Sequence, residues 1–281
     1  MKPSNAAEPA LTASERLLRH DRRILILSLV GLTGLAWVYL VVVAADMAVG
    51  DMRLMGMGRM DPAMLTMLMP MPWDSTTVVL MGLIWWIMMV GMMVPSAAPM
   101  ILLFAHVQRT NLPLENPALR ITLFTGGYLA LWLVFSGAAT ALQWVLGRWD
   151  LLLPVMKTQS ALLAAGVFVL AGVYQFTPLK NACLARCQAP LTFLSQHWRK
   201  GNLGAWQMGL HHGAYCVGCC WGLMLLLFVG GVMNLLWIAA IAAWVLIEKL
   251  LLPGRIYTAL SGSALLVGAA LVYLSQPPSG T

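Results

Sequence analysis

The stretch that decides the fold reads His211-His212-Gly213-Ala214-Tyr215-Cys216-Val217-Gly218-Cys219-Cys220-Trp221. It holds three of the five cysteines and two of the five histidines in the chain. The residues around it, from 204 to 229, are almost wholly apolar. Thiols and imidazoles are ligands of soft transition metals, and thiols are also redox groups. Their concentration inside a hydrophobic segment therefore requires a chemical explanation.

The chain as a whole is as apolar as this segment. Of its 281 residues, 60% are hydrophobic and 10% are charged, whereas a soluble domain is about 25% charged. This composition predicts an all-α polytopic membrane helix bundle, because each segment in lipid must satisfy its own backbone hydrogen bonds. The odd number of cysteines argues against a disulfide framework. The net charge of +7 is explained by basic cytoplasmic loops, and we expect no nucleic-acid partner.

Seven apolar stretches have roughly the 20 residues that a bilayer requires. They cover residues 24–45, 77–104, 120–146, 159–176, 204–229, 234–252 and 256–274. With the N-terminus inside, thirteen of the 17 Lys and Arg residues lie in cytoplasmic segments and four lie outside, which agrees with the positive-inside rule. We therefore expect about seven transmembrane helices in a bacterial inner membrane, with the N-terminus in and the C-terminus out.

This topology divides the chain into a cytoplasmic tail (1–23), a single transmembrane domain (24–274) and a short tail (275–281). The domain includes a methionine-rich outer loop (46–76) and a cysteine-containing cytoplasmic loop (177–203). The first apolar run is too long for a signal peptide, so we expect it to be retained. Pro95 and Pro99 predict a kink or break in the second helix.

The segment from 204 to 229 carries the principal candidate site. At about 100° per residue, its predicted ligands fall on one arc of about 80°, with one cysteine just beside it. The arc contains Met208, His212, Cys216 and Cys219, and Cys220 borders it. Each residue alone is explained better by ordinary burial, but the group indicates a metal or redox site, because polar groups at this depth usually face the bundle. The pairs Gly209/Gly213 and Gly218/Gly222 predict close approach of neighbouring helices.

Further sulfur ligands are predicted in three places. Met89, Met92 and Met93 of the second helix are expected at the depth of the cysteines, although methionine is also ordinary packing material. The cytoplasmic loop contributes Cys183 and Cys187, which share a face if the loop is helical. The outer loop contributes candidate metal contacts Met52, Met55, Met57 and Met60. Thioethers and thiolates together select Cu(I), and zinc is the alternative ion.

Two residues are expected to support these ligands without binding the metal. Met208 lies one turn before the predicted histidine ligand, and Glu248 lies in the sixth helix next to Lys249. The carboxylate of Glu248 either orients the His212 imidazole or pairs with Lys249. The chain has no nucleotide-binding loop and no catalytic serine motif, so no catalytic residue is predicted and we expect that it is not an enzyme.

Three segments of the chain resemble a known family. They are Met88-Met89-Val90-Gly91-Met92-Met93-Val94-Pro95-Ser96-Ala97-Ala98-Pro99-Met100; Tyr174-Gln175-Phe176-Thr177-Pro178-Leu179-Lys180 with Cys183 and Cys187; and His212 to Trp221 with Met233-Asn234 and Glu248-Lys249. They are similar to an uncharacterised bacterial family labelled "predicted metal-binding integral membrane protein", a domain-of-unknown-function family. The resemblance covers about residues 75–255 and implies the helical membrane fold and the choice of site residues. It does not extend to the methionine-rich loop or the N-terminal tail.

The sequence supports three hypotheses for function. The first is a membrane metal-binding protein that transfers, delivers or exports Cu(I) across the inner membrane. Its expected partners are the lipid bilayer and a copper chaperone or copper-dependent membrane complex. The second is a membrane thiol-disulfide oxidoreductase that uses Cys216 and Cys219. The third is a non-catalytic assembly subunit of a larger membrane complex. We favour the first, because the predicted ligands form a series from cytosolic thiols to outer thioethers.

Overall fold

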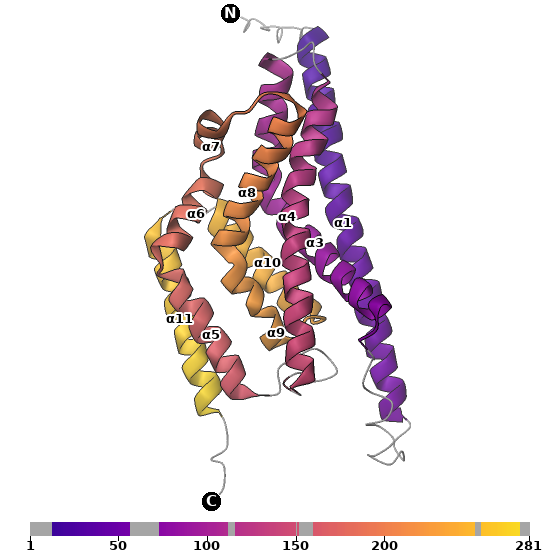
Figure 1. The fold of residues 1–281 in the computed structure, drawn as a ribbon, viewed down its shortest axis with the longest axis vertical. Coiled ribbons are helices and arrows are strands. Elements are labelled where there is room, and N and C mark those ends of the chain that lie inside the picture. Colours follow the sequence, from indigo (N-terminus) through magenta and orange to yellow (C-terminus); the bar gives the residue numbers. More distant parts are fainter. Residues whose placement is uncertain are drawn as a thin grey trace, which may run out of the picture.

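The computed structural model describes residues 13–56, 73–111, 116–149, 151, 160–250 and 254–275. Within these ranges all regular structure is helical (Figure 1), which confirms the predicted all-α class. The helices are α1 (Ala13–Gly56), α3 (Ser75–Asn111), α4 (Pro117–Arg148), α5 (Ala161–Gln175), α6 (Pro178–Gln188), α7 (Pro190–His197), α8 (Gly201–Leu225), α9 (Leu227–Gly230), α10 (Leu235–Leu250) and α11 (Arg255–Leu274).

Five of the described helical segments are long and apolar enough to cross a membrane. They are Arg22–Asp46, Ser75–Thr110, Pro117–Arg148, Gly201–Gly230 and Arg255–Leu274. Helices α5 and α6, bent by 66° at a short break, add a sixth if they are counted as one span. Helix α10 has 16 residues and falls below the length of a full span. The described part of the chain is therefore compatible with membrane insertion, and the count of seven stays a prediction.

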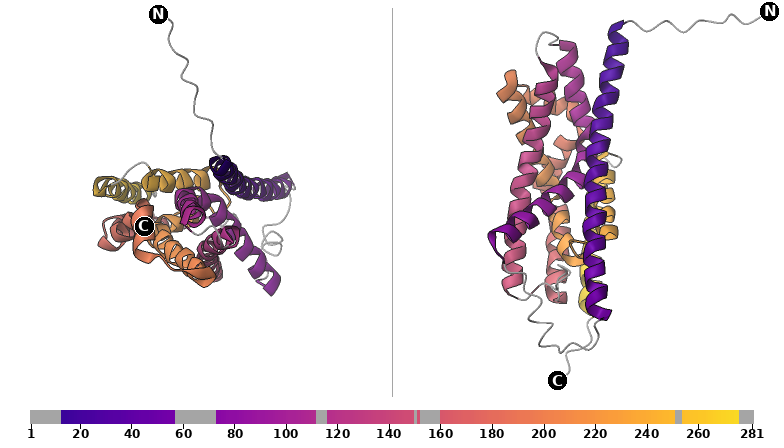
Figure 2. Two further views of the ribbon diagram at one scale, coloured as in Figure 1. Left: turned by 90° about the horizontal axis from the view of Figure 1, so that it is seen from above. Right: turned by 90° about the vertical axis from the view of Figure 1, so that its right-hand side faces the viewer.

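Most of the long helices lie roughly along one axis (Figures 1 and 2), and α8 is drawn between α6 and α4 in Figure 1. Helix α8 packs mainly on α4 and α6, and also contacts α5 and α10. Helix α3 lies between α1 and α4, while α5 and α11 pack on each other. This arrangement places the cysteines of α8 next to α4, α6 and α10, so that residues far apart in sequence surround them.

Helix α3 continues past both of its prolines, so of the predicted kink or break the break does not occur. Pro95 cannot donate to the carbonyl of Gly91 one turn earlier. That carbonyl instead accepts a hydrogen bond from the indole nitrogen of Trp37 in α1, at 3.3 Å. Helix α3 is thus held by its neighbour α1 where proline removes a hydrogen bond.

The start of helix α3 is capped by Asp74. The Thr77 amide donates to Asp74 at 2.8 Å, and the hydrogen bonds from Thr77 lower the pKa of the Asp74 carboxyl.

Close contact between α4 and α8 depends on glycine. A Cβ atom at Gly127 would clash with the main-chain carbonyl of Trp206, and one at Gly209 would clash with that of Phe124. Gly218 leaves room for the sulfur of Cys183, which would lie only 2.7 Å from an added Cβ. The close approach predicted from the glycine pairs is therefore confirmed, and it brings α4 and α6 against the face of α8 that carries the thiols.

The segment predicted as a cytoplasmic loop, 177–203, instead contains helices α6 and α7. The Thr177 hydroxyl accepts from the Lys180 amide at 3.3 Å, and Pro178 occupies the first turn of α6. Helix α1 likewise extends beyond its predicted limits, because it begins at Ala13 and ends at Gly56. The predicted tail and outer loop are thus partly helical, and residues 57–72 lie outside the described part of the chain.

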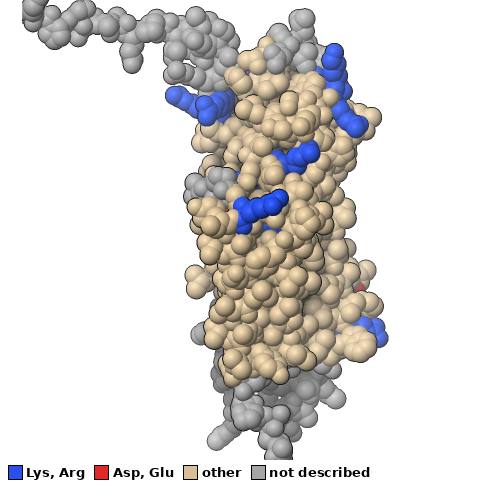
Figure 3. All heavy atoms as spheres, turned by 90° about the vertical axis from the view of Figure 1, so that its left-hand side faces the viewer, with Lys and Arg blue, Asp and Glu red and all other residues tan. Residues whose placement is uncertain are grey.

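Charge is distributed unevenly along the bundle. On the face drawn in Figure 3, Lys and Arg side chains lie mainly in the upper half, towards the end where α1 begins. Helix α11 ends at the opposite end of the bundle (Figure 1). The exposed residues Arg199 and Lys200, which precede α8, belong to this more basic end. On this face, the end of the bundle where α1 begins is therefore more basic than the opposite end.

Candidate metal centre

The predicted ligand face of α8 lies inside the bundle. Met208, His212, Cys216, Cys219 and Cys220 are each at most 3% exposed. The helical phase deduced from the sequence is thus confirmed for all five residues. Their side chains nevertheless meet different partners, so the face divides into several local environments.

Cys219 and Cys187 bring two thiols from different helices into contact. The Cys219 sulfur lies 3.9 Å from the Cys187 sulfur, which α6 places against α8. This distance is well beyond the bond length of a disulfide, about 2.05 Å, and all five cysteines are free. With metal–sulfur bonds of about 2.3 Å, two thiolate ligands of one ion lie about 3.8 to 4.0 Å apart at tetrahedral to trigonal angles. The pair therefore has the spacing of two ligands that share one ion.

Cys216 lies between two polar side chains from other helices. Its sulfur is 2.9 Å from the Lys249 ammonium nitrogen of α10 and 3.1 Å from the Tyr128 hydroxyl of α4. Lys249 also donates to the Ser96 hydroxyl at 3.3 Å, and Tyr128 donates to the Met93 carbonyl at 3.1 Å. An ammonium group that donates to sulfur stabilises negative charge there. Cys216 is thus surrounded by α3, α4 and α10 and held beside a buried positive charge.

Glu248 neither pairs with Lys249 nor hydrogen-bonds to the Nδ1 atom of His212, the two roles expected from the sequence. Its carboxylate binds the Lys180 ammonium at 2.8 and 2.9 Å, and both side chains are buried. The Gln188 amide donates to the main-chain carbonyl of Glu248 at 2.8 Å. These contacts attach α6 to α10. Glu248 therefore neutralises Lys180 and fixes the helix that carries Cys187.

His212 lies among aromatic rings. Its ring centroid is 5.5 to 6.2 Å from those of Phe193, Tyr128 and Phe124. Its Nδ1 atom is buried and has no hydrogen-bond partner. One turn earlier, the Met208 sulfur accepts the Arg199 main-chain N–H at 3.3 Å. An imidazole nitrogen without a partner is unusual in a protein interior, so His212 retains one free donor or acceptor atom at this depth.

The two remaining thiols have different surroundings. The Cys220 sulfur donates to the main-chain carbonyl of Cys216 at 3.0 Å, and the Cys219 sulfur donates to the same carbonyl at 3.1 Å. The Cys183 sulfur lies against Gly218, whose carbonyl accepts from the Tyr174 hydroxyl. Cys220 therefore lies close to Cys219 on α8, while Cys187 contacts Cys219 from α6.

The methionines of α3 line the core. Met89, Met92 and Met93 are at most 2% exposed, and the contacts of the Met93 carbonyl and Ser96 place this part of α3 beside Cys216. Met93 thus lies level with Cys216 along the bundle, as predicted, because the Tyr128 hydroxyl contacts both residues. Within the described part of the chain, no hydrogen bond links the thioethers of these three methionines to a thiol. Of the outer candidates, Met52 and Met55 fall within α1, whereas Met57 and Met60 lie outside the described residues.

Among the described residues, no group of three or more His, Cys, Asp and Glu side chains is arranged to hold a metal ion. A structural zinc site takes four such ligands, whereas thiolates also bind Cu(I) with fewer. The described thiols therefore do not form a zinc cage, and the pair Cys187 and Cys219 could supply two of the ligands of a soft ion.

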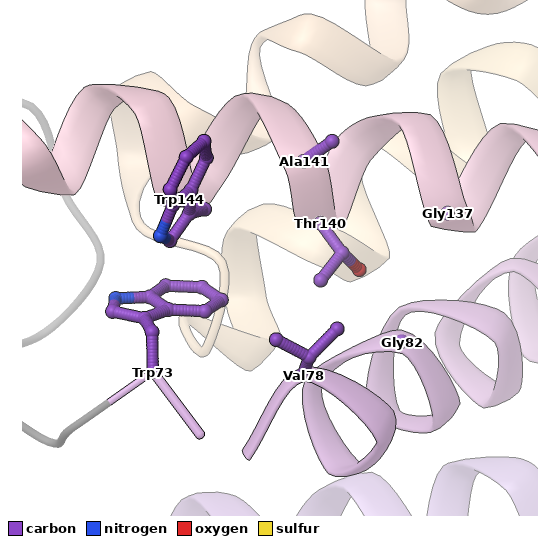
Figure 4. A pocket seen from close by; sticks show the side chains of 7 residues that line it. All are labelled: Trp73, Val78, Gly82, Gly137, Thr140, Ala141 and Trp144. Atoms are coloured by element: carbon purple, nitrogen blue, oxygen red, sulfur yellow. The ribbon is translucent and has the colours of Figure 1, made fainter. Parts of the chain in front are cut away.

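An apolar pocket between α3 and α4 lies away from these thiols. It has a volume of about 440 Å³ and is bordered by Trp73, Trp144 and five smaller residues (Figure 4). The Thr140 hydroxyl in this lining donates to the Ser136 carbonyl at 2.9 Å. Among the described residues that border the pocket there is no thiol, imidazole or charged group.

Tyr128, Lys180 and Lys249 complete the site but were missed as site residues by the sequence reasoning. Lys249 was expected only as one of two alternative partners of Glu248, although a lysine in an apolar helix is itself a signal of a buried partner. Tyr128 gave no signal, because its contact with Cys216 joins residues 88 positions apart. These partners became identifiable only when the helices were placed together.

The fold and the site define a bundle of long apolar helices with a buried cluster of thiols. The chain belongs to a copper chaperone family: residues 82–272 match the model of the family PpoB2, described as copper chaperone. The match runs from α3 into α11 and includes all five cysteines. It supports a copper-related role and overlaps the region in which the sequence motifs resemble a metal-binding membrane family. The chain matches no curated protein and no solved structure.

Proposed function

We propose that this protein is a membrane copper chaperone that holds Cu(I) inside the helix bundle. The observation that carries the proposal is the 3.9 Å approach of the Cys187 and Cys219 sulfurs between α6 and α8. Two thiolates at this spacing suit a soft monovalent ion, and zinc is the alternative cargo. Cys216 would act as a third sulfur that receives the ion from this pair or passes it on.

The membrane setting follows from the apolar helices. Five described helices reach the length of a span, and the proposed seven-span topology adds α10 and the bent pair α5–α6. We place the basic end of the bundle in the cytoplasm of a bacterium, following the positive-inside rule. Cu(I) would then reach Cys187 and Cys219 from the cytosol, and the buried methionines of α3 would lead outward.

The partner would be a protein that supplies or consumes copper at the membrane. Soft ions pass between proteins while thiolates of both proteins bind the ion together. A donor protein that presents one or two thiols would therefore suit the exposed basic end. Since the chain has no nucleotide-binding motif, the flow of copper would be driven by its own gradient, by a coupled ion or by the consuming partner.

Elemental analysis of anaerobically purified protein tests the proposal. Wild-type protein is expected to retain about one Cu(I), and Cys187→Ser and Cys219→Ser are each expected to lose it, because each removes one sulfur of the pair. Cys183→Ser is the matched control and is expected to retain copper, since its sulfur lies against Gly218 and not against the sulfur of Cys187. Stoichiometric zinc in the wild type, or unchanged copper in both pair variants, would contradict the proposal.

The same variants distinguish the two other hypotheses. A thiol oxidoreductase would form a mixed disulfide that can be trapped in one of the cysteine variants. The sulfurs of Cys216 and Cys219 meet different partners, which favours metal handling over a redox cycle between these two residues. An assembly subunit would instead keep full activity of its partner complex when Cys187 and Cys219 are replaced.

A further inference from the structure

Two histidines outside the thiol cluster lie together where α7 meets α8. The ring centroids of His197, the last residue of α7, and His211 of α8 are 6.0 Å apart, with the rings inclined at 78°. His211 is exposed and His197 is half-buried. The sequence predicts neither residue as a metal ligand, and neither takes part in the proposed copper site at Cys187 and Cys219.

A hydrogen bond at His197 fixes which nitrogen is free. Its Nδ1 atom lies 3.1 Å from the Phe193 carbonyl, which can only accept, so Nδ1 carries the proton. The Nε2 atom of the neutral ring then has its lone pair available. Histidine ligands of metals commonly donate their other N–H to a backbone carbonyl in this way. The Phe193 ring stacks on His197 at 4.8 Å and holds it in this orientation.

The spacing of the two rings suits one metal ion between them. With metal–nitrogen distances of about 2.0 Å, the centroids of two imidazole ligands lie about 5 Å apart at a tetrahedral angle and about 6.4 Å apart when the ligands are opposed. The observed 6.0 Å lies within this range. Because no third His, Cys, Asp or Glu joins them among the described residues, such a site would keep positions open for water or for ligands of a donor.

The pair lies on the side of α8 that leads to the thiols. His211, Tyr215 and Cys219 follow at intervals of four residues, so they form one stripe about 12 Å long. The ring of Tyr215 lies 6.1 Å from that of His197. Around them, Arg186 bonds to Gln196 and Arg199 bonds to Gln207, both at exposed positions. A face this polar is expected to meet water or headgroups rather than acyl chains, so the pair is accessible.

We propose that His197 and His211 form a two-imidazole site that takes a copper ion before it moves along α8 to the pair Cys187 and Cys219. The proposal rests on the proposed copper function and adds its point of entry. The arginines beside the histidines would attract a copper ion that arrives as an anionic thiolate complex. With only two protein ligands the site binds weakly, which suits transit rather than storage.

Loading kinetics test the proposal in the full-length protein. Cu(I) is supplied as its complex with bicinchoninate, and its transfer is followed by the absorbance of the chelator. His197→Ala and His211→Ala are each expected to slow loading at least 10-fold while leaving the final copper content unchanged. His106→Ala, which removes an exposed histidine of α3, is the matched control and is expected to load at the wild-type rate.

A second measurement examines the histidine pair without the thiols. In the Cys187→Ser/Cys219→Ser variant, added Cu(II) is expected to show nitrogen couplings in its electron paramagnetic resonance spectrum. Adding His211→Ala is expected to weaken this binding at least ~10-fold. Equal loading rates together with unchanged Cu(II) affinity would show that the two rings only pack together. If the wild type binds no Cu(I) while the histidine pair still binds Cu(II), the proposed function is contradicted and the histidine site is not.

Discussion

Lys249 is the residue whose position most changes the interpretation of the site. It is 5% exposed, and its ammonium group contacts the Cys216 sulfur and the Ser96 hydroxyl. A buried charge is retained only where a partner compensates it. Glu248, its neighbour in sequence, is already bound to Lys180. The Cys216 sulfur is therefore the group placed to compensate the charge of Lys249. A thiolate at this position would be suited to binding a soft cation.

Replacement of Lys249 by methionine is expected to make Cys216 less reactive. Methionine is similar in size but carries no charge, and the thiolate rather than the thiol is the nucleophile. We expect alkylation of Cys216 by N-ethylmaleimide to slow at least ~10-fold relative to the wild type. Peptide mass spectrometry measures the rate at each cysteine separately.

The control for this prediction is Ser96→Ala, which removes the other contact of Lys249 but retains the ammonium group beside the sulfur. Its Cys216 is expected to react at close to the wild-type rate. An unchanged rate in Lys249→Met would show that the contact with the ammonium group does not control the chemistry of this thiol.

At the scale of the element, the interface of α4 and α8 depends on the absence of side chains. Gly127 and Gly137 lie on the same helix, yet a Cβ at Gly127 would clash with the Trp206 carbonyl, whereas one at Gly137 would meet nothing within 4 Å. The backbones of α4 and α8 can approach closely only at the first position. The side chains of Tyr128 and Cys216 meet because the two helices lie this close.

Gly127→Ala is expected to lower the free energy of unfolding by about 1–3 kcal/mol, because the backbone of α8 must shift. Gly137→Ala is expected to leave it unchanged or to raise it by up to about 1 kcal/mol, since alanine favours the helix over glycine. Thermal unfolding of the purified protein in detergent measures both. Equal destabilisation by the two substitutions would contradict close packing at Gly127.

At the scale of the whole molecule, topology is the main expectation that remains to be tested. Helix α1 begins and α11 ends at opposite ends of the bundle (Figure 1), as an odd number of crossings requires. A green fluorescent protein fused to the N-terminus is expected to fluoresce, because it folds in the cytoplasm. An alkaline phosphatase fused to the C-terminus is expected to be active, because it folds outside. An inactive phosphatase fusion would indicate an even number of spans.

Much of the fold could be predicted from apolar length alone. The stretch predicted at 120–146 is α4 (Pro117–Arg148), and the stretch at 256–274 is α11 (Arg255–Leu274). The buried face of α8 followed from the helical period. Helices α6 and α7 were missed because they are short and not wholly apolar, although Thr177 followed by Pro178 is a typical helix start.

The contacts within the site were harder to predict because they depend on how helices pack. Helical phase placed Cys216 and Cys219 on one face but could not show that one meets Lys249 and the other Cys187. His212 and Lys249 were the two partners expected for Glu248, whereas its partner Lys180 lies 68 residues earlier in the chain. Local spacing cannot reveal such pairs, since they are determined by the relative positions of α6, α8 and α10.

The ion pair of Lys180 and Glu248 has a consequence for biosynthesis. Lys180 of α6 is translated 68 residues before Glu248 of α10. Until α10 has been made, the Lys180 ammonium group has no carboxylate partner and α6 is not attached to α10. A product that stops before α10 would therefore leave this ammonium group without its counter-charge, in an interior where an uncompensated charge is costly.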